Sequence, residues 1–227
     1  MKRNVKKTLK LWKLFLYLKF PFVSLRSIMR DKITEKSTEL FLNLGFKSVT
    51  MDEIASALGV SKKTIYAHFN TKTALVEEVA NKIFLVITEG ILDIQTQEEN
   101  PIREMYQVKR FVMHYLKDEK SSPQYQLQKY YPKIFQDLKK KQFHFMQTCI
   151  KENLRKGIKQ KLFRASIDID FIARIYFHGM MATKDRDLFP LQQLSMNDVT
   201  NYFLEYHLRG ISTEEGIKQI EKQLIQK

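Results

Sequence analysis

One short segment of the chain concentrates side chains that bind phosphate and read base edges. Between Gly59 and Lys72 there are three lysines and no acidic residue, although residues 28–75 as a whole hold seven basic and five acidic residues. Lysine ammonium groups bind phosphate oxygens, and they also pair with guanine O6 and N7 in the major groove. The side chains expected on the outer side of this segment are Lys62, Lys63, Thr64, Tyr66 and His68.

The start of the helix before this segment is strongly specified. Thr50 can cap the helix while Glu53 reaches back to the Thr50 backbone, which is a capping box. Val49 and Ile54 have the spacing of a hydrophobic staple. The sequence therefore predicts a short helix that begins after Thr50 and ends near Leu58.

A second short helix is expected directly afterwards. Gly59 supplies the positive φ of a tight turn, and Ser61 is the cap of the next helix. Val60 and Ile65 repeat the staple spacing. Two short helices that meet across such a turn form a helix-turn-helix. The first turn of the second helix offers unpaired N–H groups and the positive dipole end to a phosphate.

Further helices are expected on both sides of this pair. An apolar stripe from Ile33 to Leu44 predicts a helix over about 31–44 that is stopped by Gly45. After Thr71, the stripe from Leu75 to Ile94 predicts a helix of about six turns. Residues 100–161 predict two or three helices, with breaks at 121–123 and at Pro132. The predicted fold class is all-α.

No catalytic constellation is present in the sequence. The five histidines show no metal-ligand spacing, Cys149 has no partner thiol, and no glycine-rich phosphate loop occurs. A lone cysteine in a helix is typically a small buried hydrophobe, and its presence fits a reducing compartment. We therefore expect a cytoplasmic protein that is not an enzyme and has no metal site and no cofactor.

The amino-terminal leader carries most of the excess charge. The chain has a net charge of +14, and residues 1–27 contain eight basic residues and no acidic one. Lys13 and Lys19 interrupt the apolar run, so a membrane-spanning helix is not expected. Three interpretations of residues 1–28 remain: a basic amphipathic helix on a membrane surface, a disordered arm that tracks DNA, or an upstream start preceding Met29, which the pattern favours.

The sequence VTMDEIASALGVSKKTIYAHFNTKTALV, residues 49–76, resembles the DNA-binding signature of the TetR family of transcriptional regulators. With FLNLGFKSVT in the preceding helix, the resemblance covers residues 30–76. It implies an all-helical homodimer with a DNA-binding domain at 29–75 and a larger effector-binding and dimerisation domain at 76–227. It also implies repression at a palindromic operator in double-stranded DNA, released by a small apolar or aromatic effector.

The resemblance also assigns roles to single residues. By position, Thr50 resembles a helix cap that contacts phosphate, and Ser61 a cap that also reaches phosphate. Lysines 62 and 63 and Thr64 resemble base-reading positions. Phosphate contacts are implied for Tyr66, His68 and Lys72. Each of these side chains alone is equally compatible with an ordinary solvated or packing role, and it is their combination that favours DNA binding.

Two further sites are expected in the carboxy-terminal two thirds. Aromatic side chains there either line an effector pocket or fill the core, and the pocket candidates are Phe84, Tyr106, Phe111, Tyr130 and Phe145. The segment 168–183 is apolar nearly all round, and Ser195 with Asp198 opens a second helix. These helices either pair within one subunit or form the dimer interface. The interface candidates are Phe171, Ile172, Ile175, Gly179, Tyr202, Phe203 and Tyr206.

Two other functions remain open from the sequence. One is a constitutive or architectural DNA-binding protein without an effector, which a solid aromatic core would favour. The other is a protein held at a membrane surface by its leader, although no membrane partner is expected.

Overall fold

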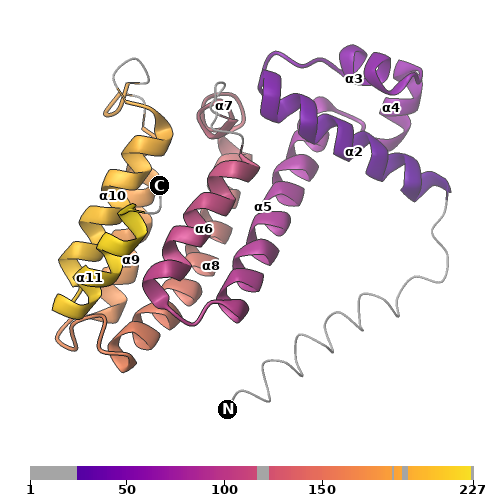
Figure 1. Cartoon of the computed structure of the whole chain (residues 1–227). Helices are drawn as coiled ribbons and strands as arrows, with labels where there is room; N and C mark the ends of the chain where they lie inside the picture. The colour runs from indigo at the N-terminus through magenta and orange to yellow at the C-terminus, as the bar shows by residue number, and fades with distance from the viewer. Residues whose placement is uncertain (1–24, 117–122, 186, 191–193, 226–227) are drawn as a thin grey trace.

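The computed structural model describes residues 25–116, 123–185, 187–190 and 194–225. Within these ranges the regular structure is helical, and one isolated β-bridge joins Phe163 and Ser212. Figure 1 shows three helices, α2 to α4, grouped at the amino-terminal end of a helical bundle formed by α5 to α11. The all-α prediction is confirmed. The leader, for which three interpretations were open, lies almost wholly outside the described residues.

The first described helix, α2 (Leu25–Leu44), begins about two turns before the predicted start at residue 31. The prediction was wrong because residues 25–30 carry no cap or stop signal and their helical turn is held by tertiary contacts. Met29 packs on the core of the DNA-binding domain, and Arg30 bonds to two other helices. The predicted end is confirmed, since Gly45 has a φ of +88°.

Helices α3 (Met51–Leu58) and α4 (Lys62–His68) form the predicted helix-turn-helix. The Glu53 amide donates to Thr50 Oγ1 at 3.2 Å, and the Thr50 amide donates to Glu53 Oε2 at 2.6 Å. These bonds to the carboxylate lower the pKa of Glu53. The turn glycine, Gly59, has a φ of +65°, and Ser61 Oγ accepts from the Thr64 amide. The local sequence signals for both helices are thus confirmed.

The three helices share one core with the start of the next helix. Phe41 and Phe46 are fully buried with their ring centroids 4.9 Å apart. Burial of the staple residues Val49 and Ile54 and of Ile65 on α4 fixes the angle between α3 and α4. The charged side of α4 is left on the surface.

Helix α5 (Lys72–Gln97) connects the DNA-binding helices to the bundle. Its 26 residues span about 39 Å. The bundle continues with α6 (Pro101–Tyr115), α7 (Pro123–Tyr130) and α8 (Pro132–Lys159). The last two begin at proline, as the predicted breaks require.

Three helices complete the bundle: α9 (Ile169–Ala182), α10 (Met196–Ile211) and α11 (Glu214–Ile225). Asp168 and Ser195 cap α9 and α10. Helix α10 continues through Gly210 to Ile211, and Ser212 follows in an extended conformation. Helix α11 packs on α6, which closes the bundle. None of the helices in the described ranges is long and apolar enough to cross a membrane.

Candidate DNA-binding surface and ligand cavity

Helix α4 presents a positively charged surface with no acidic residue of its own. Lys62, Lys63 and Tyr66 are exposed, while Thr64 and His68 are half-buried. Thr50 and Ser61 are exposed at the amino-terminal ends of α3 and α4. The predicted DNA contacts on α4 and at the two helix starts are therefore exposed or half-buried at the surface of the helix-turn-helix. This arrangement suits a negatively charged backbone that lies across both helix starts.

Lys62 forms an ion pair across the two helices. Its Nζ lies 2.8 Å from Asp52 Oδ2, and this hydrogen bond raises the pKa of Lys62. Both side chains are more than half exposed, so the pair contributes little to stability. A phosphate oxygen would therefore compete with Asp52 for the same ammonium group.

Lys72, at the first position of α5, is tied to the loop after α2. Its Nζ donates to the Lys47 carbonyl at 3.0 Å, and partial burial lowers the pKa of Lys72. Lys47 is in turn held by α7, because its amide donates to Gln126 Oε1 at 2.9 Å and its ammonium lies 4.7 Å from the centroid of the Tyr130 ring. Helix α7 of the bundle thus reaches a predicted phosphate-binding lysine through one loop residue.

Arg30 connects α2 with the end of α4 and with α5. Its Nη1 donates to the His68 carbonyl and its Nη2 to Glu78 Oε2, both at 2.8 Å. The guanidinium group also lies 4.1 Å from the centroid of the Phe69 ring. No local sequence pattern marks Arg30, because its partners are 38 and 48 residues away along the chain.

Replacing Arg30 with lysine is expected to weaken binding to a specific DNA site about tenfold. Lysine keeps the charge but cannot make both bonds of the planar fork, so α4 is less firmly oriented. Lys62, Lys63 and Lys72, which are predicted to contact DNA, are all retained, so the salt dependence of binding should stay the same. Fluorescence anisotropy at several salt concentrations measures the DNA affinity and its salt dependence. Thermal unfolding is the control for folding. Unchanged site affinity would contradict this role for Arg30.

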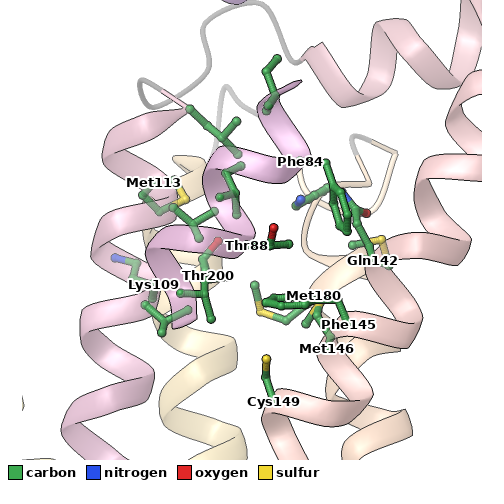
Figure 2. A pocket seen from close by; sticks show the side chains of 18 of the residues that line it. Phe84, Thr88, Lys109, Met113, Gln142, Phe145, Met146, Cys149, Met180 and Thr200 are labelled. Atoms are coloured by element: carbon green, nitrogen blue, oxygen red, sulfur yellow. The ribbon is translucent and has the colours of Figure 1, made fainter. Parts of the chain in front are cut away.

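A cavity of about 210 Å³ lies between α5, α6, α8, α9 and α10. Figure 2 shows side chains from these helices converging on it. Phe84 and Phe145 are on its wall with their rings edge to face at 6.3 Å. At the end nearest the DNA-binding helices, its lining includes Leu42 and Phe46.

The other three aromatic pocket candidates do not line this cavity. Tyr106 is buried in the core of the bundle, and that burial raises the pKa of its hydroxyl to about 12. Phe111 packs directly on Gly90, where α5 and α6 approach each other. Tyr130 is on the outer side of α7 over Lys47. All three occupy helix contacts that depend on residues distant in the sequence.

The cavity wall also includes residues beyond the five aromatic pocket candidates. Six methionines and Cys149 provide a polarisable, adaptable lining. Burial raises the pKa of the Cys149 thiol to about 12, so this group is protonated at neutral pH. Polar side chains are fewer. They include Gln95 on α5, Glu104 on α6, and Gln142 and Asn153 on α8.

The outer side of α9 and α10 carries an unusual number of exposed apolar side chains. Phe171 and Ile175 on α9 are 59% and 48% exposed, and Tyr202 and Tyr206 on α10 are 62% and 77% exposed. The other three interface candidates, Ile172, Gly179 and Phe203, are half-buried, and the Phe203 ring lies on Gly179. The structure thus brings four of the seven candidates to one exposed surface.

No group of three metal-ligating side chains is found among the residues that the structure describes. Three features of the described residues point to a function: the lysines of α4, the cavity, and the exposed apolar surface of α9 and α10.

Comparison with known proteins gives a consistent result. The sequence profile of the bacterial regulatory proteins of the tetR family matches residues 33–79. The HTH-type transcriptional repressor KstR2 of Mycolicibacterium smegmatis is 25% identical over 196 residues, which are 83% of this chain and 93% of that protein. The regulator IcaR of Staphylococcus aureus, a negative regulator of the biofilm operon icaADBC, is 29% identical over 79 residues, which are 35% of this chain and 42% of IcaR.

Solved structures share the fold at low identity. A TetR-family transcriptional regulator from Agrobacterium tumefaciens has a TM-score of 0.66 at 15% identity and covers 83% of this chain and 100% of its own. A complex of SmeT with triclosan has a TM-score of 0.62 at 13% identity, with coverage of 82% and 93%. The similarity extends over both the DNA-binding helices and the bundle.

Proposed function

The chain belongs to the TetR family of bacterial transcriptional regulators, and from this premise we propose that it is a repressor released from DNA by a small apolar molecule. Recognition of DNA is assigned to α4, with Lys62, Lys63 and Thr64 facing the major groove. Thr50, Ser61, Tyr66, His68 and Lys72 bind the phosphates on either side.

One observation carries the ligand-responsive part of the proposal. The cavity is bounded by Leu42 and Phe46 of the DNA-binding domain as well as by α5. A ligand that extends to this end of the cavity touches Leu42 on α2 and Phe46 in the loop that follows α2. It also presses on α5, whose first residue is Lys72.

Release follows from geometry if two subunits bind one operator. The two α4 helices of a helix-turn-helix dimer must lie about 34 Å apart to enter successive major grooves. A ligand that tilts α5 changes this separation. The contact from Gln126 of α7 through Lys47 to Lys72 offers a second route from the bundle to the DNA-binding surface.

We assign the dimer interface to the exposed apolar surface formed by Phe171, Ile175, Tyr202 and Tyr206. Two copies that pair these surfaces would bury them in a bundle of four helices. The variant Tyr202→Glu/Tyr206→Glu is expected to be monomeric in sedimentation equilibrium and to bind an operator at least tenfold more weakly. Ile225→Glu, at an 82% exposed apolar position on α11, is the matched control. A dimeric double variant would overturn this assignment.

Selection of bound sequences from a random duplex pool tests the proposed function. We expect a palindrome with one fixed spacing between its half-sites. Recovery of no motif, with binding lost at physiological salt, would mean that the lysines provide only non-specific attraction, and the proposal would fail.

A further inference from the structure

One end of the cavity contains a buried cluster of polar side chains. Glu104 on α6 is only 3% exposed and lines the cavity. Lys156 Nζ lies 2.7 Å from Glu104 Oε2, and this ion pair neutralises the carboxylate. Gln95 on α5 and Asn153 on α8 both donate to Glu104 Oε1, at 3.1 and 2.8 Å. The carboxylate thus accepts three hydrogen bonds from the protein.

These bonds determine which way the two amides face. Asn153 Nδ2 donates to the Pro101 carbonyl and to Glu104, so exchanging its oxygen and nitrogen would place an oxygen against two acceptors. Asn153 is 2% exposed, and its Oδ1 has no hydrogen-bond partner among the described residues. A buried acceptor without a donor carries a substantial free-energy penalty.

Gln95 faces the same way for the same reason. Its Nε2 donates to Glu104 Oε1 and to the Cys149 carbonyl, at 3.1 and 3.3 Å. Its side-chain oxygen therefore points away from both acceptors, and no donor within the described ranges bonds to it. Gln95 and Asn153 both line the cavity, but the Asn153 oxygen is enclosed by protein atoms, so the amide oxygen of Gln95 is the acceptor left for a ligand at the polar end.

The rest of the cavity wall determines the chemical character of the remainder of a ligand that binds at this polar end. Phe84, Phe145 and Met180 make the neighbouring surface apolar. A dry cavity of about 150 Å³ holds benzene, so about 210 Å³ accommodates a somewhat larger apolar body.

Building on the ligand site of the proposed function, we propose that the cavity selects an uncharged alcohol or phenol. Its hydroxyl donates its one proton to the amide oxygen of Gln95, and its apolar body lies against Phe84 and Phe145. A carboxylate is disfavoured here, because it has no proton to donate and would face the Gln95 oxygen and the Glu104 carboxylate. A ligand ammonium group is also disfavoured. Glu104 is already neutralised by Lys156, so it does not offset the free-energy cost of removing the ammonium group from water.

The cavity wall also contains lysines, which offer an alternative location for an anionic head group. Lys109 donates to Asn197 Oδ1 on α10, and Lys184 follows α9. The competing arrangement is a ligand whose carboxylate binds these lysines. The experiment must distinguish such a ligand from one whose hydroxyl binds at the polar end.

Calorimetric titration of the full chain with 1-octanol, octanoate and octylamine tests the proposal, since the three probes share one chain length. We expect 1-octanol to bind at least tenfold more tightly than either charged probe. Gln95→Met keeps a side chain of similar length but removes the acceptor and also the donor to Glu104, so it should weaken octanol binding about fivefold. Gln142→Met, at the other glutamine of the wall, is the matched control and should change octanol affinity less than twofold.

Tighter binding of octanoate, or an equal effect of the two glutamine variants, would overturn the proposed selectivity. Failure of all three probes to bind would also overturn it. Release of operator DNA is measured separately, by anisotropy with and without octanol. Octanol that binds selectively but does not release DNA would support the inference on ligand class while contradicting the proposed repressor mechanism.

Discussion

Replacing Lys62, Lys63 and Lys72 together with glutamine is expected to lower the affinity for duplex DNA by two to three orders of magnitude near physiological salt. Each lysine that neutralises a phosphate releases counterions, so removing it lowers the slope of log affinity against log salt by about 0.9. Removing all three lysines should reduce the slope by about 2.7. Anisotropy titrations over a range of salt concentrations around the physiological value give both quantities.

The chain contains a control with the same change in charge. Lysines 139, 140 and 141 are exposed on α8, in the bundle. Their triple replacement by glutamine alters the net charge equally but should leave the slope almost unchanged. Equal slopes for the two triple variants would show that DNA binding depends on net charge alone, and the assignment of the α4 surface would be wrong.

The single variants should not be equivalent. Lys62 already forms an ion pair with Asp52, so Lys62→Gln should reduce the DNA affinity less than Lys63→Gln. Removing the competitor should have the opposite effect, and Asp52→Asn is expected to strengthen DNA binding about twofold to fivefold. Weaker binding of Asp52→Asn would mean that the ion pair orients Lys62 instead of competing with phosphate.

The DNA-binding helices could be predicted because their signals are local. A capping box, a staple and a turn glycine each involve residues within five positions. Thr50 and Ser61 cap α3 and α4 as predicted, and Gly59 has the predicted left-handed conformation. The start of α2 could not be predicted in this way. It depends on Arg30, whose hydrogen-bonding partners lie on α4 and α5.

The cavity illustrates the same limit. Phe84 and Phe145 line it, whereas Phe111, equally apolar and also on a bundle helix, packs on Gly90. Helix contacts between segments that are distant in the sequence decide which of two similar rings lies on the cavity wall. The polar end was missed because Glu104 and Asn153 are 49 residues apart, and no short-range spacing connects them.

His207 is expected to make the folded protein lose stability on acidification between about pH 6.5 and pH 4. The ring is 6% exposed on α10, with its centroid 4.7 Å from that of Tyr176. Its Nε2 is buried and has no hydrogen-bond partner in the part of the chain that the structure describes. This burial lowers the pKa of His207 from 6.5 to about 4.

The sign of the effect follows from proton uptake. Below pH 6.5 the unfolded chain binds a proton at His207 that the folded protein does not bind until about pH 4. The stabilisation is therefore complete above pH 6.5 and falls by about 1.4 kcal/mol per pH unit below it, or about 3 kcal/mol in total. His207→Phe keeps an aromatic ring beside Tyr176 but cannot titrate, so it should remove this part of the pH dependence.

Urea unfolding at pH 7.5, 6.0 and 5.0 measures the difference. Carboxylates contribute to acid denaturation in every variant, so the informative quantity is the free energy of unfolding of the wild type minus that of His207→Phe. This difference should decrease steadily as the pH is lowered. His144→Gln, at an exposed histidine on α8, should follow the wild type. A difference independent of pH would mean that the protonated ring is accommodated by movement of α10 against α9, and that the buried position of His207 is not retained on acidification.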